Sequence, residues 1–297
     1  MSLAQARPVM NSLRDFWERE RRRIEAELER WLPESAAVQS RLWAAMRYAA
    51  LGEGKRLRPV LAVAGFQSLR GQGEAIYPVA ASLEMLHTYS LVHDDLPCMD
   101  DDDTRRGRAT VHVAFDEATA LLAGDALQAT AFELLAHFAT PEITALIARA
   151  IGADGMAGGQ MADLDAEGEV PTEKLVVDIH RRKTGALIAA AIVAGGMMAG
   201  ADEPTQRQLD GYGRPLGLAF QIIDDLLELT QSAEALGKPT GSDLKHQKVT
   251  YPAAVGNDTA CRHAARLVAE AKTALTSYPG DPAILLALAD FVIERDR

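Results

Sequence analysis

The sequence has few cysteines and no excess of positive charge. Its two cysteines, Cys98 and Cys261, lie far apart in a chain of 297 residues. We therefore expect a reducing compartment, and neither a disulfide framework nor a four-ligand zinc site. Lys and Arg number 31 against 42 Asp and Glu, a formal net charge of -11. Because no global positive field is present to hold DNA or RNA, nucleic acid is not an expected partner.

Long apolar runs are also absent. The longest run covers residues 186–201 and includes three glycines. A membrane-spanning helix needs about 20 apolar residues, so we expect a buried helix here and no membrane span. Residues 14–31 carry dense mixed charge, which leaves no apolar segment for a secretory signal. We therefore expect a cytoplasmic protein.

Apolar residues recur with helical spacing along almost the whole chain, and alternating strand-like runs are largely absent. We predict an all-α protein, a helical bundle that forms a single domain over residues 1–297. Polar loops are expected at 52–59, 97–110 and 232–250, and binding residues often lie on such loops. The predicted helices span residues 12–31, 36–51, 60–70, 75–93, 114–139, 141–150, 152–167, 172–201, 203–230, 251–256, 259–277 and 282–296.

A first acidic cluster follows one of these helices, with six aspartates in residues 94–103. Asp94 and Asp95 would lie in the last helical turn, and a proline two residues later would end the helix. The chain would then fold back and bring Asp100 or Asp101 close to them. Like charges repel at a helix C-terminus, where the helix dipole already disfavours anions. A solvated acidic loop is therefore a poor explanation, and the cluster indicates a cation site.

A second acidic pair, Asp224 and Asp225, lies inside an apolar helix. Gln221 precedes Asp224 by three residues and shares its face. Adjacent carboxylates in such a helix are costly unless they are paired or bind a metal. A salt bridge with Lys238 or Arg214 is one alternative. Carboxylate oxygens also suit Mg²⁺, which commonly uses one or two of them with substrate phosphates and waters. The sharper hypothesis is a magnesium ion that bridges a phosphate.

Basic residues near both acidic clusters favour phosphate binding. Lys55, Arg56 and Arg58 lie on a glycine-flanked loop and could cradle a diphosphate. Arg105 and Arg106 directly follow the first aspartates, where simple charge balance is the alternative. His87 lies about two helical turns before the first acidic cluster, on roughly the same face.

Two further segments carry a lysine near polar or small residues. Lys183 and Thr184 precede the long apolar run, where Thr184 could also act only as a helix cap. Lys238 lies on a loop 13 residues after Asp225. Gln160 and Asp163 share a helix face and are either site residues or ordinary surface polar groups.

Six motifs in this order resemble the trans-isoprenyl diphosphate synthase family, most closely its bacterial farnesyl diphosphate synthases. They are GKRLRP, DDLPCMDDDDTRRG, GGQMADL, KTG, FQIIDDLLE, and GKPTGSD followed by KVTYP. The resemblance spans nearly the whole chain. It implies an isoprenoid synthase bundle with a central cavity between the two Asp-rich motifs, and a homodimer. It also implies Mg²⁺-dependent head-to-tail transfer of an allylic group to isopentenyl diphosphate.

The resemblance also implies roles for individual residues. Three Mg²⁺ ions are expected with substrate bound, and the implied metal ligands are Asp94, Asp95, Asp100 and Asp224. The implied site for isopentenyl diphosphate consists of Lys55, Arg58, His87 and Arg106. The implied site for the allylic diphosphate consists of Arg105, Lys183, Thr184, Gln221 and Lys238. The implied catalytic residues are Lys183, Thr184, Gln221, Asp224, Asp225 and Lys238.

Product length depends on the residues before the first Asp-rich motif. Tyr89 precedes Asp94 by five residues, about 7.5 Å along a helix, and would block a long chain unless it is an ordinary core residue. With Ser90 it forms a pair similar to that of fifteen-carbon synthases. Geranylgeranyl or geranyl diphosphate formation is the main alternative. A class I terpene cyclase, a non-catalytic partner subunit and a generic acidic scaffold are weaker ones.

The sequence departs from the family pattern at three positions. Glu228 replaces the usual third aspartate of the second motif, and Thr104 replaces a common leucine. Gln247 stands where a glycine normally precedes Lys248, so the role of Lys248 stays open. None of these changes removes an implied ligand.

Overall fold

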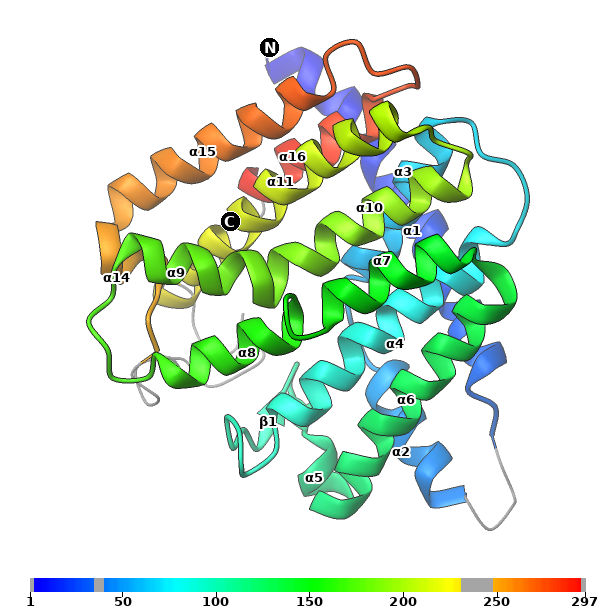
Figure 1. The fold of residues 1–297 in the computed structure, drawn as a ribbon, viewed down its shortest axis with the longest axis vertical. Coiled ribbons are helices and arrows are strands. Elements are labelled where there is room, and N and C mark those ends of the chain that lie inside the picture. Colours follow the sequence, from blue (N-terminus) through cyan, green and yellow to red (C-terminus); the bar gives the residue numbers. More distant parts are fainter. Residues whose placement is uncertain (1–2, 35–39, 231–247, 295–297) are drawn as a thin grey trace.

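A computed structural model describes residues 3–34, 40–230 and 248–294. These residues form layers of helices with one short hairpin, so the all-α prediction is confirmed (Figure 1). The helices are α1 (Leu3–Trp31), α2 (Ser40–Ala50), α3 (Leu57–Ser68), α4 (Ile76–Asp94), α5 (Val111–Ala114), α6 (Glu117–Phe138), α7 (Pro141–Ile151), α8 (Met156–Asp165), α9 (Glu173–His180), η1 (Arg181–Gly185), α10 (Ala186–Met198), α11 (Glu203–Thr230), α14 (Tyr251–Val255), α15 (Asn257–Ala274) and α16 (Ala283–Glu294). No helix in the described part of the chain is long and apolar enough to cross a membrane.

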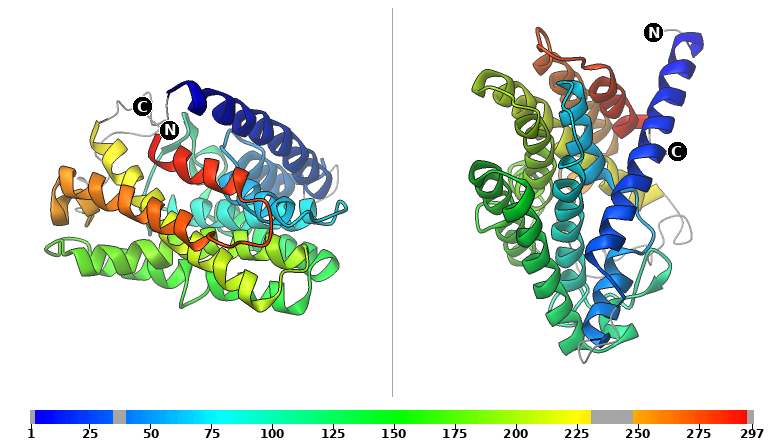
Figure 2. Two further views of the ribbon diagram at one scale, coloured as in Figure 1. Left: turned by 90° about the horizontal axis from the view of Figure 1, so that it is seen from above. Right: turned by 90° about the vertical axis from the view of Figure 1, so that its right-hand side faces the viewer.

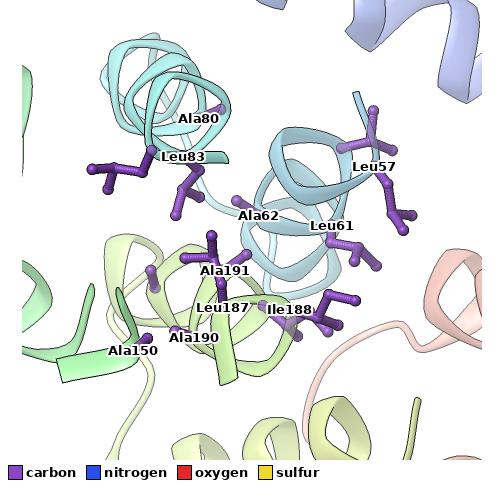
Figure 3. Packing of buried hydrophobic residues seen from close by; sticks show 14 of the residues in the cluster. Leu57, Leu61, Ala62, Ala80, Leu83, Ala150, Leu187, Ile188, Ala190 and Ala191 are labelled. Carbon is purple, nitrogen blue, oxygen red and sulfur yellow. The ribbon is translucent and has the colours of Figure 1, made fainter. Parts of the chain in front are cut away.

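Helix α4 lies in the interior, because every residue from Ile76 to Leu86 is buried. A helix that is buried all round has no polar face, which explains its lack of an apolar stripe. It packs against α6 and α3, and α3 in turn packs against α10. Figure 3 shows the packing of α3, α4 and α10, in which Leu83 of α4 and Ala62 of α3 lie close to Ala191 of α10. The core therefore holds α4, which carries the first acidic cluster, in a fixed position.

Glycines allow α3 and α10 to approach closely. A Cβ atom on Gly195 of α10 would lie 1.9 Å from the carbonyl oxygen of Ala62, and one on Gly65 of α3 would lie 2.5 Å from that of Ile192. Neither distance is sterically possible. The long apolar run of the sequence is thus a buried helix, as expected.

The helix predicted over 172–201 is confirmed, because the helical run is unbroken from Glu173 to Met198. It is not a uniform α-helix, since the π-helical segment η1 lies between α9 and α10. A Cβ on Gly159 of α8 would lie 2.2 Å from the backbone nitrogen of Lys183, so α8 packs directly on the backbone of η1. Such π segments frequently occur at functional sites, and this one carries Lys183 and Thr184.

Other helix limits also differ from prediction. The helix expected over 114–139 is divided into α5 and α6, because the Asp116 side chain caps α6 by accepting a hydrogen bond from the Thr119 N–H at 2.6 Å. Helix α3 begins three residues early, at Leu57, and α8 begins at Met156 rather than at Gly152. Helix α1 begins at Leu3, nine residues before the predicted start.

The predicted loop 97–110 contains an unpredicted hairpin of β1 (Thr104–Arg105) and β2 (Arg108–Ala109), which pair antiparallel. Its turn residues Arg106 and Gly107 have φ angles of 52° and 72°. Two positive φ angles are what a two-residue type I′ turn requires. Most of the third predicted loop, including Lys238, lies outside the described residues.

Candidate active site

A cavity of about 1140 Å³ opens where α4 ends, beside α8, η1 and α11. The end of α4 lies close to α8 and to β1 (Figure 1). The structure brings fourteen of the predicted site residues to its lining: Lys55, Arg58, His87, Tyr89, Ser90, Asp94, Asp100, Arg105, Arg106, Lys183, Thr184, Gln221, Asp224 and Asp225.

The first acidic wall is a turn that folds back on the end of α4. The N–H of Asp100 donates to the carbonyl oxygen of Asp94 at 2.8 Å, which is the return predicted from the proline. Gln160 donates to the Asp94 carboxylate at 2.5 Å. Lys183 lies 3.8 Å from the same carboxylate and 2.7 Å from Asp163. The segment GGQMADL therefore faces the acidic wall from α8.

Lys248 completes this wall from the far end of the chain. Its ammonium donates to Asp100 at 2.6 Å and lies 3.9 Å from Asp163. Although burial lowers the pKa of Lys248, the two carboxylates raise it above its usual value. Burial raises the pKa of Asp94, and Lys183 only partly offsets this effect. The wall thus concentrates negative charge that two lysines balance.

Replacing Lys248 by Met tests this pairing. We expect the free energy of unfolding to fall by about 3 kcal/mol, the usual cost of removing one partner of a buried ion pair. Because Mg²⁺ can replace the lost charge at Asp94 and Asp100, MgCl₂ should raise the melting temperature of this variant more than that of the wild type. The matched control is Lys272→Met, which breaks a pair with Asp290 away from the cavity lining. Equal effects of MgCl₂ on all three proteins would contradict the pairing.

Asp95, predicted as a metal ligand, does not line the cavity. Its carboxylate accepts from Arg105 at 2.6 and 2.7 Å. Burial raises the pKa of Asp95 to about 6, against the opposing effect of Arg105. The contacts of Asp95 therefore fix the guanidinium of Arg105 at the cavity edge. Asp94 and Asp100, rather than Asp95, line the cavity.

A basic pocket is formed around Arg58 and His87, which also line the cavity. Among the described residues, neither Nε of Arg58 nor Nδ1 of His87 has a hydrogen-bond partner, although both atoms are buried. Burial lowers the pKa of Arg58 to about 10. Burial, together with Arg58 and Arg106, lowers the pKa of His87 well below its usual value. Unsatisfied buried donors are costly, so this pocket is suited to an anion with several oxygen atoms.

The second acidic pair belongs to a chain of hydrogen bonds that connects η1, α11 and α14. Thr184 donates to the side-chain oxygen of Gln221 at 2.8 Å, and the Gln221 amide donates to Asp225 at 3.1 Å. The other Asp225 oxygen accepts the backbone N–H of Tyr251 at 2.8 Å. Burial raises the pKa of Asp225 to about 7. Asp225 therefore positions Gln221, and Asp224 remains on the cavity lining.

Two alternative interpretations, a salt bridge from Arg214 to the second acidic pair and a helix cap by Thr184, do not hold within the described residues. Arg214 pairs with Asp210 at 2.6 Å rather than with the acidic pair. Thr184 makes no helix-capping bond, because its hydroxyl is directed at Gln221.

Tyr89 lies at the cavity lining with its ring largely buried. The His93 ring meets it edge-on at 5.8 Å between centroids, and the Gln128 side chain of α6 lies beside its hydroxyl. His93 in turn contacts the carbonyl oxygen of Leu121 at 3.0 Å. Ser90 donates to the carbonyl oxygen of His87 at 2.8 Å. Contacts from two helices therefore hold the Tyr89 ring in place.

Sequence reasoning left Lys248 open, predicted a phosphate contact for Arg56 rather than its pairing with Glu84, and missed His180. Lys248 follows the unusual Gln247, although its KVTYP context was the signal that could have found it. His180 lies 3.4 Å from Asp225, and only its place three residues before the KTG motif pointed to the site. The buried pairing of Arg56 has no sequence signal, because its partner Glu84 lies on another helix.

Two acidic walls beside a buried anion pocket, in an all-α bundle, define an enzyme that handles diphosphates. The polyprenyl synthetase family model matches residues 39–276. The farnesyl diphosphate synthase of Escherichia coli is 44% identical over 267 residues, with 85% of this chain and 88% of that protein covered. The geranylgeranyl diphosphate synthase of Cyanophora paradoxa is 41% identical over 263 residues, with 86% and 88% covered.

A solved structure agrees with these relatives. The geranyltransferase of Helicobacter pylori, complexed with magnesium and isoprenyl diphosphate, aligns with a TM-score of 0.83 and 33% identity, and 94% of this chain and 97% of that chain are covered. The chain belongs to the polyprenyl synthetase family and is a trans-prenyltransferase.

Proposed function

We propose that the chain is a farnesyl diphosphate synthase. It condenses isopentenyl diphosphate head-to-tail with dimethylallyl and then geranyl diphosphate. The observation that carries the fifteen-carbon product is Tyr89, one and a half helical turns before Asp94. Its ring lines the cavity and is held by His93 and Gln128. A growing chain that starts at Asp94 and runs along α4 meets this ring.

The acidic walls fit Mg²⁺, whose preferred ligands are carboxylate and phosphate oxygens. Asp94 and Asp100 would hold ions on one wall and Asp224 on the other, three in all with substrate bound. Within the described residues, no group of three or more His, Cys, Asp or Glu lies close enough to hold a metal. We therefore expect diphosphate oxygens to complete each coordination shell. Bound Mg²⁺ supplies positive charge that weakens the allylic carbon–oxygen bond.

Basic side chains assist the departure of the allylic diphosphate. Lys183 and Arg105 line the cavity on the side of the first acidic wall, and Lys238 is the third group that we assign to this task. Cations placed where negative charge develops stabilise the transition state. Lys183 balances Asp94 and Asp163 without substrate, so it is already positioned to contact the incoming phosphate.

The allylic cation then faces a polar wall. Thr184 donates its hydrogen to the Gln221 oxygen, which leaves oxygen lone pairs of both groups for the positive carbon. Isopentenyl diphosphate, held by Lys55, Arg58, His87 and Arg106, supplies the electron pair of its double bond. A carbon–carbon bond forms, and the proton lost afterwards goes to the released diphosphate, as the family resemblance implies.

Two alternatives account for less of this geometry. A terpene cyclase has no need of the second anion pocket around Arg58 and His87. A non-catalytic partner subunit has no need of two acidic walls, yet Asp94 and Asp224 both line the cavity.

The proposal includes a homodimer. Large apolar side chains are normally rare on an exposed helix face, but Leu121 and Leu122 of α6 are 48% and 55% exposed, and Val113 of the adjoining α5 is 48% exposed. Helices α5 and α6 pack against each other. A second copy of the chain would cover these residues.

Primer acceptance tests the proposed product. We expect the purified protein to elongate dimethylallyl and geranyl diphosphate with isopentenyl diphosphate, and to leave farnesyl diphosphate almost unextended, because Tyr89 meets its fifteen-carbon chain. Initial rates with each primer, measured with labelled isopentenyl diphosphate, check this. Comparable rates with all three primers would support geranylgeranyl diphosphate as the product.

A further inference from the structure

The loop before α3 is held in place by three side chains, of which Trp17 lies outside the cavity lining and Arg56 and Arg106 lie on it. The indole N–H of Trp17, in α1, donates to the carbonyl oxygen of Lys55 at 2.8 Å. Arg106 donates to the carbonyl oxygen of Glu53 at 2.7 Å. Arg56 donates to that of Gly52 at 2.6 Å. Three carbonyl groups in four residues are therefore fixed by side chains.

Arg56 adds a buried connection to α4. Its guanidinium donates to Glu84 at 2.7 Å, and both side chains are almost fully buried. Glu84 lies three residues before His87, on the helix that forms the basic pocket. Glu25 of α1 lies 3.6 Å from the same guanidinium. The loop is thereby connected to the helix of His87 and to α1.

The backbone at Arg56 explains why such contacts are needed. Its φ angle is 53°, in the left-handed region that residues other than glycine disfavour. A strained conformation persists only where its surroundings enforce it. This conformation separates Lys55 from Arg58, so that both side chains line the cavity from one short segment. Neither Trp17 nor Glu25 lines the cavity.

We propose that Trp17 and the Arg56–Glu84 pair are positioning residues for the isopentenyl diphosphate site. They hold the loop so that Lys55 and Arg58 converge with His87 on one diphosphate. The proposal rests on the assignment of this pocket to isopentenyl diphosphate. The Trp17 ring also packs against Phe291 of α16 at 5.1 Å between centroids, and Figure 2 shows α16 beside α1. The C-terminal helix α16 therefore helps to hold Trp17, the anchor of the loop at Lys55, in place.

The selective variant is Trp17→Phe, which keeps an aromatic ring against Phe291 and removes the N–H that holds Lys55. We expect the dissociation constant of isopentenyl diphosphate, measured calorimetrically without an allylic substrate, to rise about threefold to tenfold, as for one lost hydrogen bond. The KM for geranyl diphosphate should not change, because Lys183 and Arg105 do not contact this loop.

The matched control is Trp31→Phe. Trp31 also lies in α1 and also donates its indole N–H, here to Glu27 at 2.9 Å, but it does not contact the loop. We expect wild-type affinity for isopentenyl diphosphate in this variant. Glu84→Gln should weaken isopentenyl diphosphate binding in the same selective way, because the buried ion pair at Arg56 is lost.

An unchanged dissociation constant in Trp17→Phe would overturn the proposal. Equal losses in Trp17→Phe and Trp31→Phe, or equal losses for both diphosphates, would also overturn it, because they indicate a general effect on α1 or on the whole cavity. The product length of the wild type is measured separately. A twenty-carbon product would refute the farnesyl assignment and leave the anchor intact.

Discussion

Alanine at Asp94 or at Asp224 should abolish Mg²⁺-dependent prenyl transfer and leave the helical fold in place. These two carboxylates line the cavity from different helices, α4 and α11, and each is assigned a different metal ion. Loss of either removes electrostatic stabilisation of the departing diphosphate, so we expect kcat/KM to fall about a thousandfold or more. Steady-state rates over a range of MgCl₂ concentrations measure the effect.

The fold should tolerate the change at Asp94. Burial and the charge of Asp100 raise the pKa of Asp94, which means that its ionised form is less favourable in the folded protein than in the unfolded chain. We therefore expect the melting temperature of Asp94→Ala not to fall below that of the wild type. Asp210→Ala is the matched control for Asp224, since both lie on α11 and Asp210 pairs only with Arg214 at the surface. Near-normal turnover in Asp94→Ala or Asp224→Ala would refute the metal assignment.

Alanine at Tyr89 should lengthen the product. Removal of the ring opens the cavity along α4, so we expect the main product to change from fifteen to twenty or more carbon atoms. The lost packing against His93 should cost about 3 kcal/mol of stability, within the usual range for an aromatic residue replaced by Ala. Chromatography of the dephosphorylated alcohols measures the product, and chemical denaturation measures the stability.

Tyr89→Phe separates the ring from its hydroxyl. It keeps the blocking ring and loses only the hydroxyl beside Gln128, so its product should stay at fifteen carbon atoms. If Tyr89→Ala also keeps a fifteen-carbon product, another residue sets the limit.

The sequence predicted the parts of the fold that depend on local pattern. The limits of α11, Glu203–Thr230, match the predicted ones, because an apolar stripe and flanking polar residues define that helix. The return of Asp100 to Asp94 also followed from local chemistry, since a proline ends the helix and forces the chain to turn.

The remaining features depend on partners that are distant in sequence. The π segment around Lys183 arises where Gly159 brings α8 against the backbone, and no local pattern encodes that contact. The family resemblance implied Asp95 as a metal ligand, but the hairpin directs Arg105 onto it. Arg106 adopts a positive φ angle in that hairpin, where sequence preference alone would favour glycine or asparagine.

The central claim is best tested by the product of the wild-type protein itself. The protein is incubated with Mg²⁺, labelled isopentenyl diphosphate and either dimethylallyl or geranyl diphosphate, and the dephosphorylated alcohols are sized by chromatography. We predict farnesol as the main alcohol from both primers, and no product without Mg²⁺. Geranylgeraniol as the main alcohol would contradict the role of Tyr89, and no elongation with either primer would contradict the assigned reaction.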